Sequence, residues 1–174
     1  YVKSTCKQHY YFDLNMSLKI EIIDDFLSEE DLKELQSLDL KNTPDREMNV
    51  YVKKIEKNNE ISGLGISNEA TIKLQKNYHD KALNLLKRLN SKKADLYEYS
   101  EFGITDTGTN YNFPIHNDTP NKLLSGVIFL SPKESVGTKF YKNKNGDGEN
   151  SIDWKVNRAV FFSRLENESW HSFN

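Results

Sequence analysis

The feature that most constrains the fold is a series of short segments in the second half of the chain, each rich in β-branched and aromatic residues. Such segments, bounded by turn-forming clusters, are typical of β-strands. They span residues 94–99, 111–116, 123–130, 137–142, 152–155, 159–163 and 170–173. Residues 103–108 and 145–148 carry the glycines expected of a loop and of a hairpin turn. Because no helical pattern separates these segments, they predict an antiparallel sandwich or barrel.

The first half of the chain predicts a strand followed by helices. Residues 18–26 alternate so that Leu18, Ile20 and Ile22 share one face of the strand. A second strand is predicted over residues 50–55.

The sequence predicts two helices, the first from its capping residues and the second from its apolar face. Ser28 is placed to cap the first helix, and Asp31 stands where its capping-box partner belongs. Residues 67–89 predict a longer helix because apolar residues recur at helical spacing. This stripe consists of Leu74, Tyr78, Ala82, Leu85 and Leu89.

The 174 residues have the length of one ordinary domain, and no repeat or linker divides them. We therefore expect a single α+β domain that is mainly β. Residues 1–93 would supply a strand and helices packed on one sheet, and residues 94–174 would supply the β core.

Charge and hydropathy exclude several classes of partner. The net charge of −2 and the scattered lysines provide no basic surface for nucleic acid. No apolar run approaches the ~20 residues that span a bilayer, and the start of the chain does not read as a signal peptide. Cys6 is the only cysteine, so an internal disulfide cannot form. These features favour a reducing, cytoplasmic location.

The residues best placed for chemistry are His116, Asp118 and His171. His116 and Asp118 are two residues apart at the end of a predicted strand, so both side chains can point to the same face. His171 lies on the last predicted strand. This strand would have to neighbour the strand that ends at His116. Two imidazoles and one carboxylate form the facial triad of non-haem Fe(II) oxygenases, and zinc hydrolases use similar ligands. The other two histidines, His9 and His79, are predicted at the surface.

Several stretches together resemble the prolyl 4-hydroxylase-like branch of the 2-oxoglutarate/Fe(II) dioxygenases. They are YEYSEFG (97–103), FPIHNDTPNKLLSGVIFLSP (113–132), GTKFYKN (137–143), NRAVFFSRLENESWHSF (157–173) and, near the start, IEIIDDFLSEEDLKEL (20–35). The last stretch before the C-terminus is the most specific, because an Asn-Arg turn, an apolar strand and Trp-His-Ser come in that order.

The resemblance implies a double-stranded β-helix of the jelly-roll or cupin kind, with iron held by His116, Asp118 and His171. The implied reaction is hydroxylation of an unactivated C–H, coupled to decarboxylation of 2-oxoglutarate. Fe(II), 2-oxoglutarate and dioxygen are the implied cofactor and co-substrates, and ascorbate is a further candidate. The substrate would be a prolyl or other peptide side chain, an amino acid or a small molecule.

The resemblance also suggests residues near the co-substrate. Tyr97 and Tyr99 are expected on one face of a strand, where either could hydrogen-bond 2-oxoglutarate, and Ser125 could do likewise. A core position is an equal alternative for the tyrosines. Arg158 matches the structural Asn-Arg turn, and Arg164 lies in the loop before His171.

Family members anchor the far carboxylate of 2-oxoglutarate with an Arg or Lys about one strand beyond the second histidine. Only three residues follow His171 here. We therefore expect a final strand and its cation beyond Asn174, and weak binding of 2-oxoglutarate without them. The available substitutes are Lys142, Lys155, Arg158 and Arg164.

Two other functions are consistent with the sequence. One is a non-catalytic β-helix binding protein that has lost turnover of 2-oxoglutarate, motivated by the missing cation. The other is a cupin-like metalloenzyme with a different metal, although cupins usually supply more histidines. Succinate release would distinguish the first from an enzyme.

Overall fold

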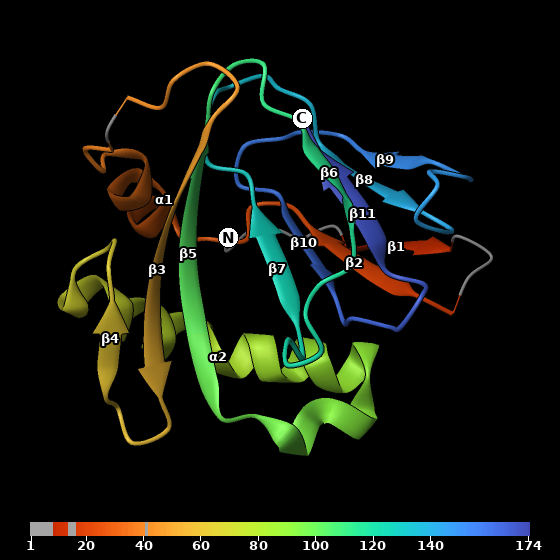
Figure 1. Ribbon diagram of the computed structural model, residues 1–174. Helices are drawn as coiled ribbons and strands as arrows, with labels where there is room; N and C mark the ends of the chain where they lie inside the picture. The colour runs from red at the N-terminus through yellow and green to blue at the C-terminus, as the bar shows by residue number, and fades with distance from the viewer. Residues whose placement is uncertain (1–8, 14–16, 41) are drawn as a thin grey trace, which may run out of the picture. The chain divides into compact units, whose positions relative to one another are not determined.

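The computed structural model describes residues 9–13, 17–40 and 42–174. The fold is mostly β, with three antiparallel sheets and a few helices (Figure 1), which confirms the predicted α+β, mainly β class. The described chain divides into two compact units. The first comprises the described residues up to Gln36 together with Pro114–Phe173, and the second comprises the described residues of Ser37–Phe113 together with Asn174.

The first sheet of the first unit has the strand order β1-β2-β10-β7. These strands are β1 (His9–Asp13), β2 (Lys19–Ile23), β10 (Ala159–Phe162) and β7 (Ser125–Ile128). β2, β7 and β10 lie within predicted strands, whereas β1 was not predicted. Ile22 is opposite Val160 and Ile20 is opposite Phe162 in the antiparallel register, so β2 and β10 present apolar side chains on one shared face.

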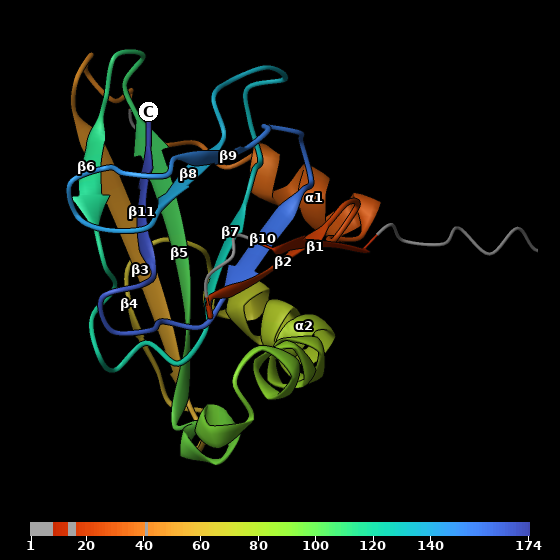
Figure 2. The ribbon, with the colours of Figure 1, turned by 90° about the vertical axis from the view of Figure 1, so that its right-hand side faces the viewer.

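The second sheet of this unit has the order β6-β11-β8-β9. Its strands are β6 (Phe113–His116), β11 (Trp170–Phe173), β8 (Thr138–Tyr141) and β9 (Asn150–Ile152). Figure 2 shows β11 and β8 running side by side. The strand predicted over 152–155 was wrong beyond Ile152, because the hairpin register pairs Asn150 with Phe140 and ends the strand at Ile152. The predicted turn over 145–148 is confirmed, since it joins β8 to β9.

One hydrophobic core is built from side chains of both sheets. Its buried members are Leu18, Ile20, Ile22, Phe129, Phe140, Ile152, Val160 and Phe162. Phe140 of β8 and Phe162 of β10 meet edge to face, with ring centroids 5.1 Å apart. Edge-to-face packing is a preferred arrangement of aromatic rings. The inner faces of the two sheets are therefore held together at the level of these two rings.

A short helix, α1 (Glu29–Gln36), follows β2. It begins as predicted, because the Asp31 amide donates to Ser28 Oγ at 3.1 Å. Asn157 holds Leu27, the residue before the capping Ser28. The Asn157 side chain accepts from the Leu27 amide at 2.9 Å and donates to the Leu27 carbonyl at 3.0 Å. Asn157 has φ +63°, in the left-handed region that Asn tolerates better than most residues.

The second unit contains the third sheet, ordered β4-β3-β5. Its strands are β3 (Met48–Glu56), β4 (Ile61–Gly63) and β5 (Tyr99–Thr107). Two predictions were wrong here. The strand expected over 94–99 is largely replaced by a 3₁₀ helix, η1 (Ser91–Leu96), and the loop expected over 103–108 mostly belongs to β5.

The reason for both differences is the long ladder between β3 and β5. All nine residues of β5 pair with β3, from Tyr99 opposite Glu56 to Thr107 opposite Met48. Continuous pairing outweighs the low strand propensity of Gly103. Gly108 serves a close approach instead, because a Cβ there would lie 2.1 Å from the Pro44 carbonyl oxygen.

The long helix of the second unit, α2 (Asn68–Leu89), confirms the predicted helix over 67–89. Ser67 caps it, since Ser67 Oγ accepts from the Ala70 amide at 3.0 Å. Its buried residues are Thr71, Leu74, Tyr78, Leu85 and Leu86. Across the described ranges, no helix is both long enough and apolar enough to cross a membrane.

Candidate metal centre

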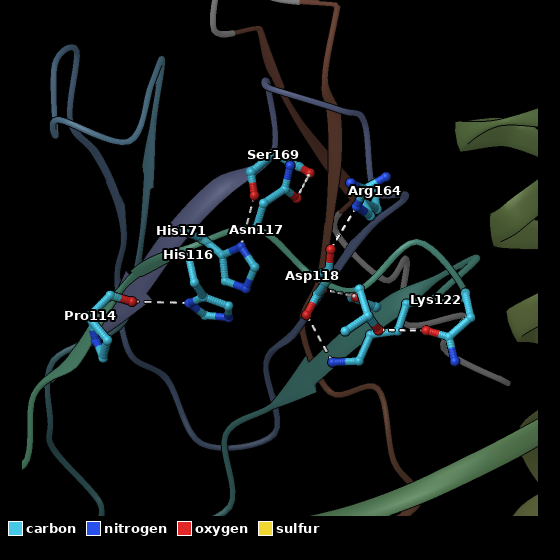
Figure 3. A network of polar contacts seen from close by, with 11 residues as sticks. Pro114, His116, Asn117, Asp118, Lys122, Arg164, Ser169 and His171 are labelled. Atoms are coloured by element: carbon cyan, nitrogen blue, oxygen red, sulfur yellow. Dashed lines mark hydrogen bonds and ion pairs between the residues drawn. The ribbon is translucent and has the colours of Figure 1, made fainter.

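Two neighbouring strands of the second sheet bring three candidate ligands together. His116 ends β6, His171 lies on β11, and Asp118 follows His116 by two residues. One ligand atom from each of the three side chains lies within 4.8 Å of the other two. The predicted neighbourhood of the two histidine-bearing strands is confirmed, and Figure 3 shows the three side chains converging.

Both imidazoles are oriented by backbone carbonyls. His116 Nδ1 donates to the Pro114 carbonyl at 3.0 Å, and His171 Nδ1 donates to the Ser169 carbonyl at 2.9 Å (Figure 3). A carbonyl oxygen only accepts, so Nδ1 carries the hydrogen in each ring. Nε2 is then the nitrogen left for a metal, and a hydrogen bond at the opposite nitrogen is the usual support of a ligating histidine.

His171 is buried against aromatic residues of the core. Its ring centroid lies 4.9 Å from that of Phe162 and 5.8 Å from that of Phe140. Burial lowers the pKa of His171 below its usual value, and the neighbouring His116 adds to this effect. The hydrogen bond to Ser169 and the charge of Asp118 oppose it without reversing it. The neutral form of His171, which metals bind, is therefore favoured.

Asp118 is buried, with a side chain only 6% exposed. Ser125 Oγ donates to Asp118 Oδ2 at 2.5 Å, and the Lys122 ammonium donates to Oδ1 at 2.8 Å. Burial alone would raise the pKa of Asp118, but the hydrogen bonds from Lys122 and Ser125 and the field of His171 outweigh it. The pKa of Asp118 consequently lies below its usual value, and the carboxylate is anionic at neutral pH.

The loop before β11 fastens the chain between His116 and Asp118. Asn117 Nδ2 donates to the Leu165 carbonyl at 3.0 Å, and Ser169 Oγ donates to Asn117 Oδ1 at 2.5 Å. Arg164 Nε donates to the Asp118 carbonyl at 2.6 Å. Asn117, Ser169 and Lys122 were not predicted as site residues, because their contacts join segments far apart in sequence or depend on a loop conformation.

The predicted co-substrate residues fall in different units. Ser125, at the start of β7, contacts Asp118 as described above. Tyr97 and Tyr99 belong to the second unit, and Tyr97 precedes β5 rather than sharing a strand face with Tyr99. The Tyr97 hydroxyl accepts from Gln75 at 3.2 Å.

Two remaining expectations concern residues outside the metal ligands. His79, predicted at the surface, is half-buried, and its ring centroid lies 4.8 Å from that of Tyr97. The side chain of His9 and the whole of Cys6 lie outside the described residues.

Two of the cations considered as anchors pair with one carboxylate. Arg158 Nε and Nη2 donate to the two oxygens of Asp24 at 2.7 and 3.2 Å, and Lys155 Nζ donates to Asp24 Oδ2 at 2.8 Å. The hydrogen bond from Arg158, supported by Lys155, holds the pKa of Asp24 below its usual value despite partial burial. Arg158 therefore has the structural role that the sequence suggested.

A separate open hollow lies within the second unit. It has a volume of about 570 Å³ and is lined by Arg46, Asn110, Tyr111 and Asn112. Asp45 holds one of these lining residues, because its Oδ1 accepts from the Asn110 amide at 2.9 Å.

Comparison with protein-family models, curated proteins and solved structures gave no significant match. The functional assignment consequently depends on the donor set and its surroundings. Two imidazoles and one carboxylate suit a divalent transition metal, and three ligands would leave coordination positions open. This chemistry fits non-haem iron, and it also fits a catalytic zinc ion.

Proposed function

We propose that the protein is a 2-oxoglutarate- and Fe(II)-dependent dioxygenase that hydroxylates an unactivated C–H of a peptide, amino acid or small molecule. The observation that carries the proposal is the convergence of His116, Asp118 and His171 from two adjacent strands, with both Nδ1 atoms held by carbonyls. Three protein ligands on one side of an ion leave room for a bidentate co-substrate and dioxygen.

The arrangement of strands supports a double-stranded β-helix. From β6 to β11 the chain passes between the two sheets of the first unit, since β7 and β10 belong to one sheet and the other four strands to the second. A chain that winds between two sheets around one core is typical of jelly-roll architectures. We propose this architecture for the first unit, with the metal ligands at one end of β6.

Bound iron and 2-oxoglutarate would supply the oxidising power for C–H cleavage. The residues of this chain hold and shape the site. His116 and His171 leave Nε2 for the metal, because Nδ1 of each ring bonds to a carbonyl, and Asp118 supplies the negative charge. Ser125 fixes the orientation of the carboxylate, while Phe140 and Phe162 keep water away from one side of His171. Such fixed positioning is the protein's main contribution in cofactor-dependent oxidation.

The proposal is tested by anaerobic titration of the Fe(II)-loaded protein with 2-oxoglutarate. We expect the visible metal-to-ligand charge-transfer band of an Fe(II)–keto-acid chelate, followed by succinate release when oxygen and a substrate panel are supplied. H116A and H171A should both abolish Fe(II) binding. H79A is the matched control. His79 is half-buried and packs against the ring of Tyr97, but it does not belong to the cluster of candidate ligands.

Each outcome has a distinct meaning for the proposal. A chelate band without succinate across the panel would favour the non-catalytic binding protein. Tight Zn(II) binding with no chelate band would favour a hydrolytic zinc centre. Full Fe(II) affinity in H116A would overturn the ligand assignment itself.

A further inference from the structure

Lys122 places a positive charge against the side chain of a candidate metal ligand, Asp118. Its ammonium lies 2.8 Å from Asp118 Oδ1, and its side chain is 49% exposed while that of Asp118 is 6% exposed. The backbone prepares this approach, because the Lys122 amide donates to the Thr119 carbonyl at 3.1 Å. The lysine thus reaches from solvent to a buried carboxylate.

The charges around the site are unbalanced once a metal is considered. A divalent ion and one ligand carboxylate leave one net positive charge when both imidazoles are neutral. The Lys122 ammonium adds a second positive charge at the same carboxylate. Two like charges at one anion repel each other, and a small dianion would neutralise both.

We propose that Lys122 is a positioning residue that pairs with a carboxylate of the anionic ligand bound at the metal. This inference rests on the proposed function, because it assigns the cation for the keto-acid co-substrate. When the metal takes Asp118, the flexible four-carbon stem of Lys122 allows its ammonium to turn from Asp118 to the incoming anion. A compact charge on a flexible stem is suited to such an exchange.

Three other cations considered as anchors have hydrogen-bond partners other than the Asp118 carboxylate. Arg158 and Lys155 both bond to Asp24, and Arg164 Nε bonds to the Asp118 backbone carbonyl. Lys122 differs from these three because its charged group contacts the side-chain carboxylate of Asp118, the candidate ligand. Lys122 therefore contacts the Asp118 side chain directly, whereas Arg164 contacts the Asp118 backbone.

The role predicts two effects of opposite sign in K122M. Removing a positive charge next to the metal should raise metal affinity, by roughly 2–5-fold for a half-exposed charge. Removing the partner of the anion should lower anion affinity by about tenfold. A merely structural role of Lys122 in holding Asp118 would instead lower both affinities.

The experiment measures Fe(II) affinity anaerobically by competition with a chromophoric chelator, and then the affinity of the Fe(II)-loaded protein for 2-oxoglutarate and for oxalate. K122R should keep anion affinity near that of the wild type, because it retains the charge. K33M is the matched control. Lys33 also pairs with a carboxylate four residues away, Glu29, at 2.6 Å, but both side chains of this pair are far more exposed than those of Lys122 and Asp118. K33M should change neither affinity.

The inference is overturned if K122M lowers metal affinity, or if it leaves the affinities for both anions unchanged. It is also overturned if the wild type binds neither anion. Oxalate separates this result from failure of the proposed function. If the wild type binds oxalate but not 2-oxoglutarate, the dioxygenase proposal fails, while a K122M defect in oxalate binding still supports the role of Lys122.

Discussion

The hydroxyl of Ser169 is expected to couple the stability of the fold to the proposed metal centre. Ser169 is fully buried, its Oγ donates to Asn117 Oδ1 at 2.5 Å, and it accepts from the Leu165 amide at 3.0 Å. S169A removes both hydrogen bonds and leaves the side-chain oxygen of Asn117 and the amide of Leu165, both on half-buried residues, without that partner. Each lost hydrogen bond costs about 1 kcal/mol, and an unsatisfied group costs about 1–3 kcal/mol. We expect unfolding free energy to fall by about 2–4 kcal/mol.

The assay is urea unfolding of the metal-free protein, followed by metal titration of the folded variant. Asn117 lies between His116 and Asp118, so loosening it should also lower metal affinity by about 10-fold, the lower end of the effects seen for supporting residues. S163A is the control, since the buried Ser163 donates one hydrogen bond to the Leu123 carbonyl at 2.8 Å. It should cost about 1 kcal/mol. Equal losses in the two variants, or unchanged metal affinity in S169A, would refute the reasoning.

Two further predictions concern the framework of the first unit. D24N should lower the free energy of unfolding by about 2–3 kcal/mol, because Arg158 and Lys155 lose a charged acceptor. The pKa of Asp24 is depressed in the folded state, so its contribution is present above the unfolded pKa and is lost as pH falls through the folded value; acid titration of stability should be shallower in D24N than in wild type. N157A should cost about 2–4 kcal/mol through two lost hydrogen bonds and a strained φ. N157G, which relieves only the strain, should be about 1 kcal/mol less damaging in the same urea assay, and equal losses would exclude strain as a cause.

The elements that the sequence predicts correctly are those whose signal is local. Ser67 and Ser28 cap their helices because a side-chain oxygen accepts an amide three residues ahead, and that spacing is visible in the sequence. The strand around Val160 and Phe162 is predicted by continuous apolar and aromatic character, and both residues are fully buried. The spacing of His116 and Asp118 likewise predicted that the two side chains lie close together, and they do, although Asp118 lies beyond the end of β6 and not on its face.

What lies beyond local signals was decided by pairing between distant segments. β5 runs through Gly103 because β3 offers it nine paired positions, and no pattern within residues 99–107 identifies that partner. The contacts of Asn117 with Leu165 and Ser169 join residues about fifty positions apart, so their hydrogen bonds arise only when the loop before β11 lies beside the residue that follows β6. The sequence by itself therefore determined which side chains could bind a metal. The tertiary structure decided how Lys122, Ser125 and Ser169 hold that site, because hydrogen bonds depend on distance and direction in space rather than on separation along the chain.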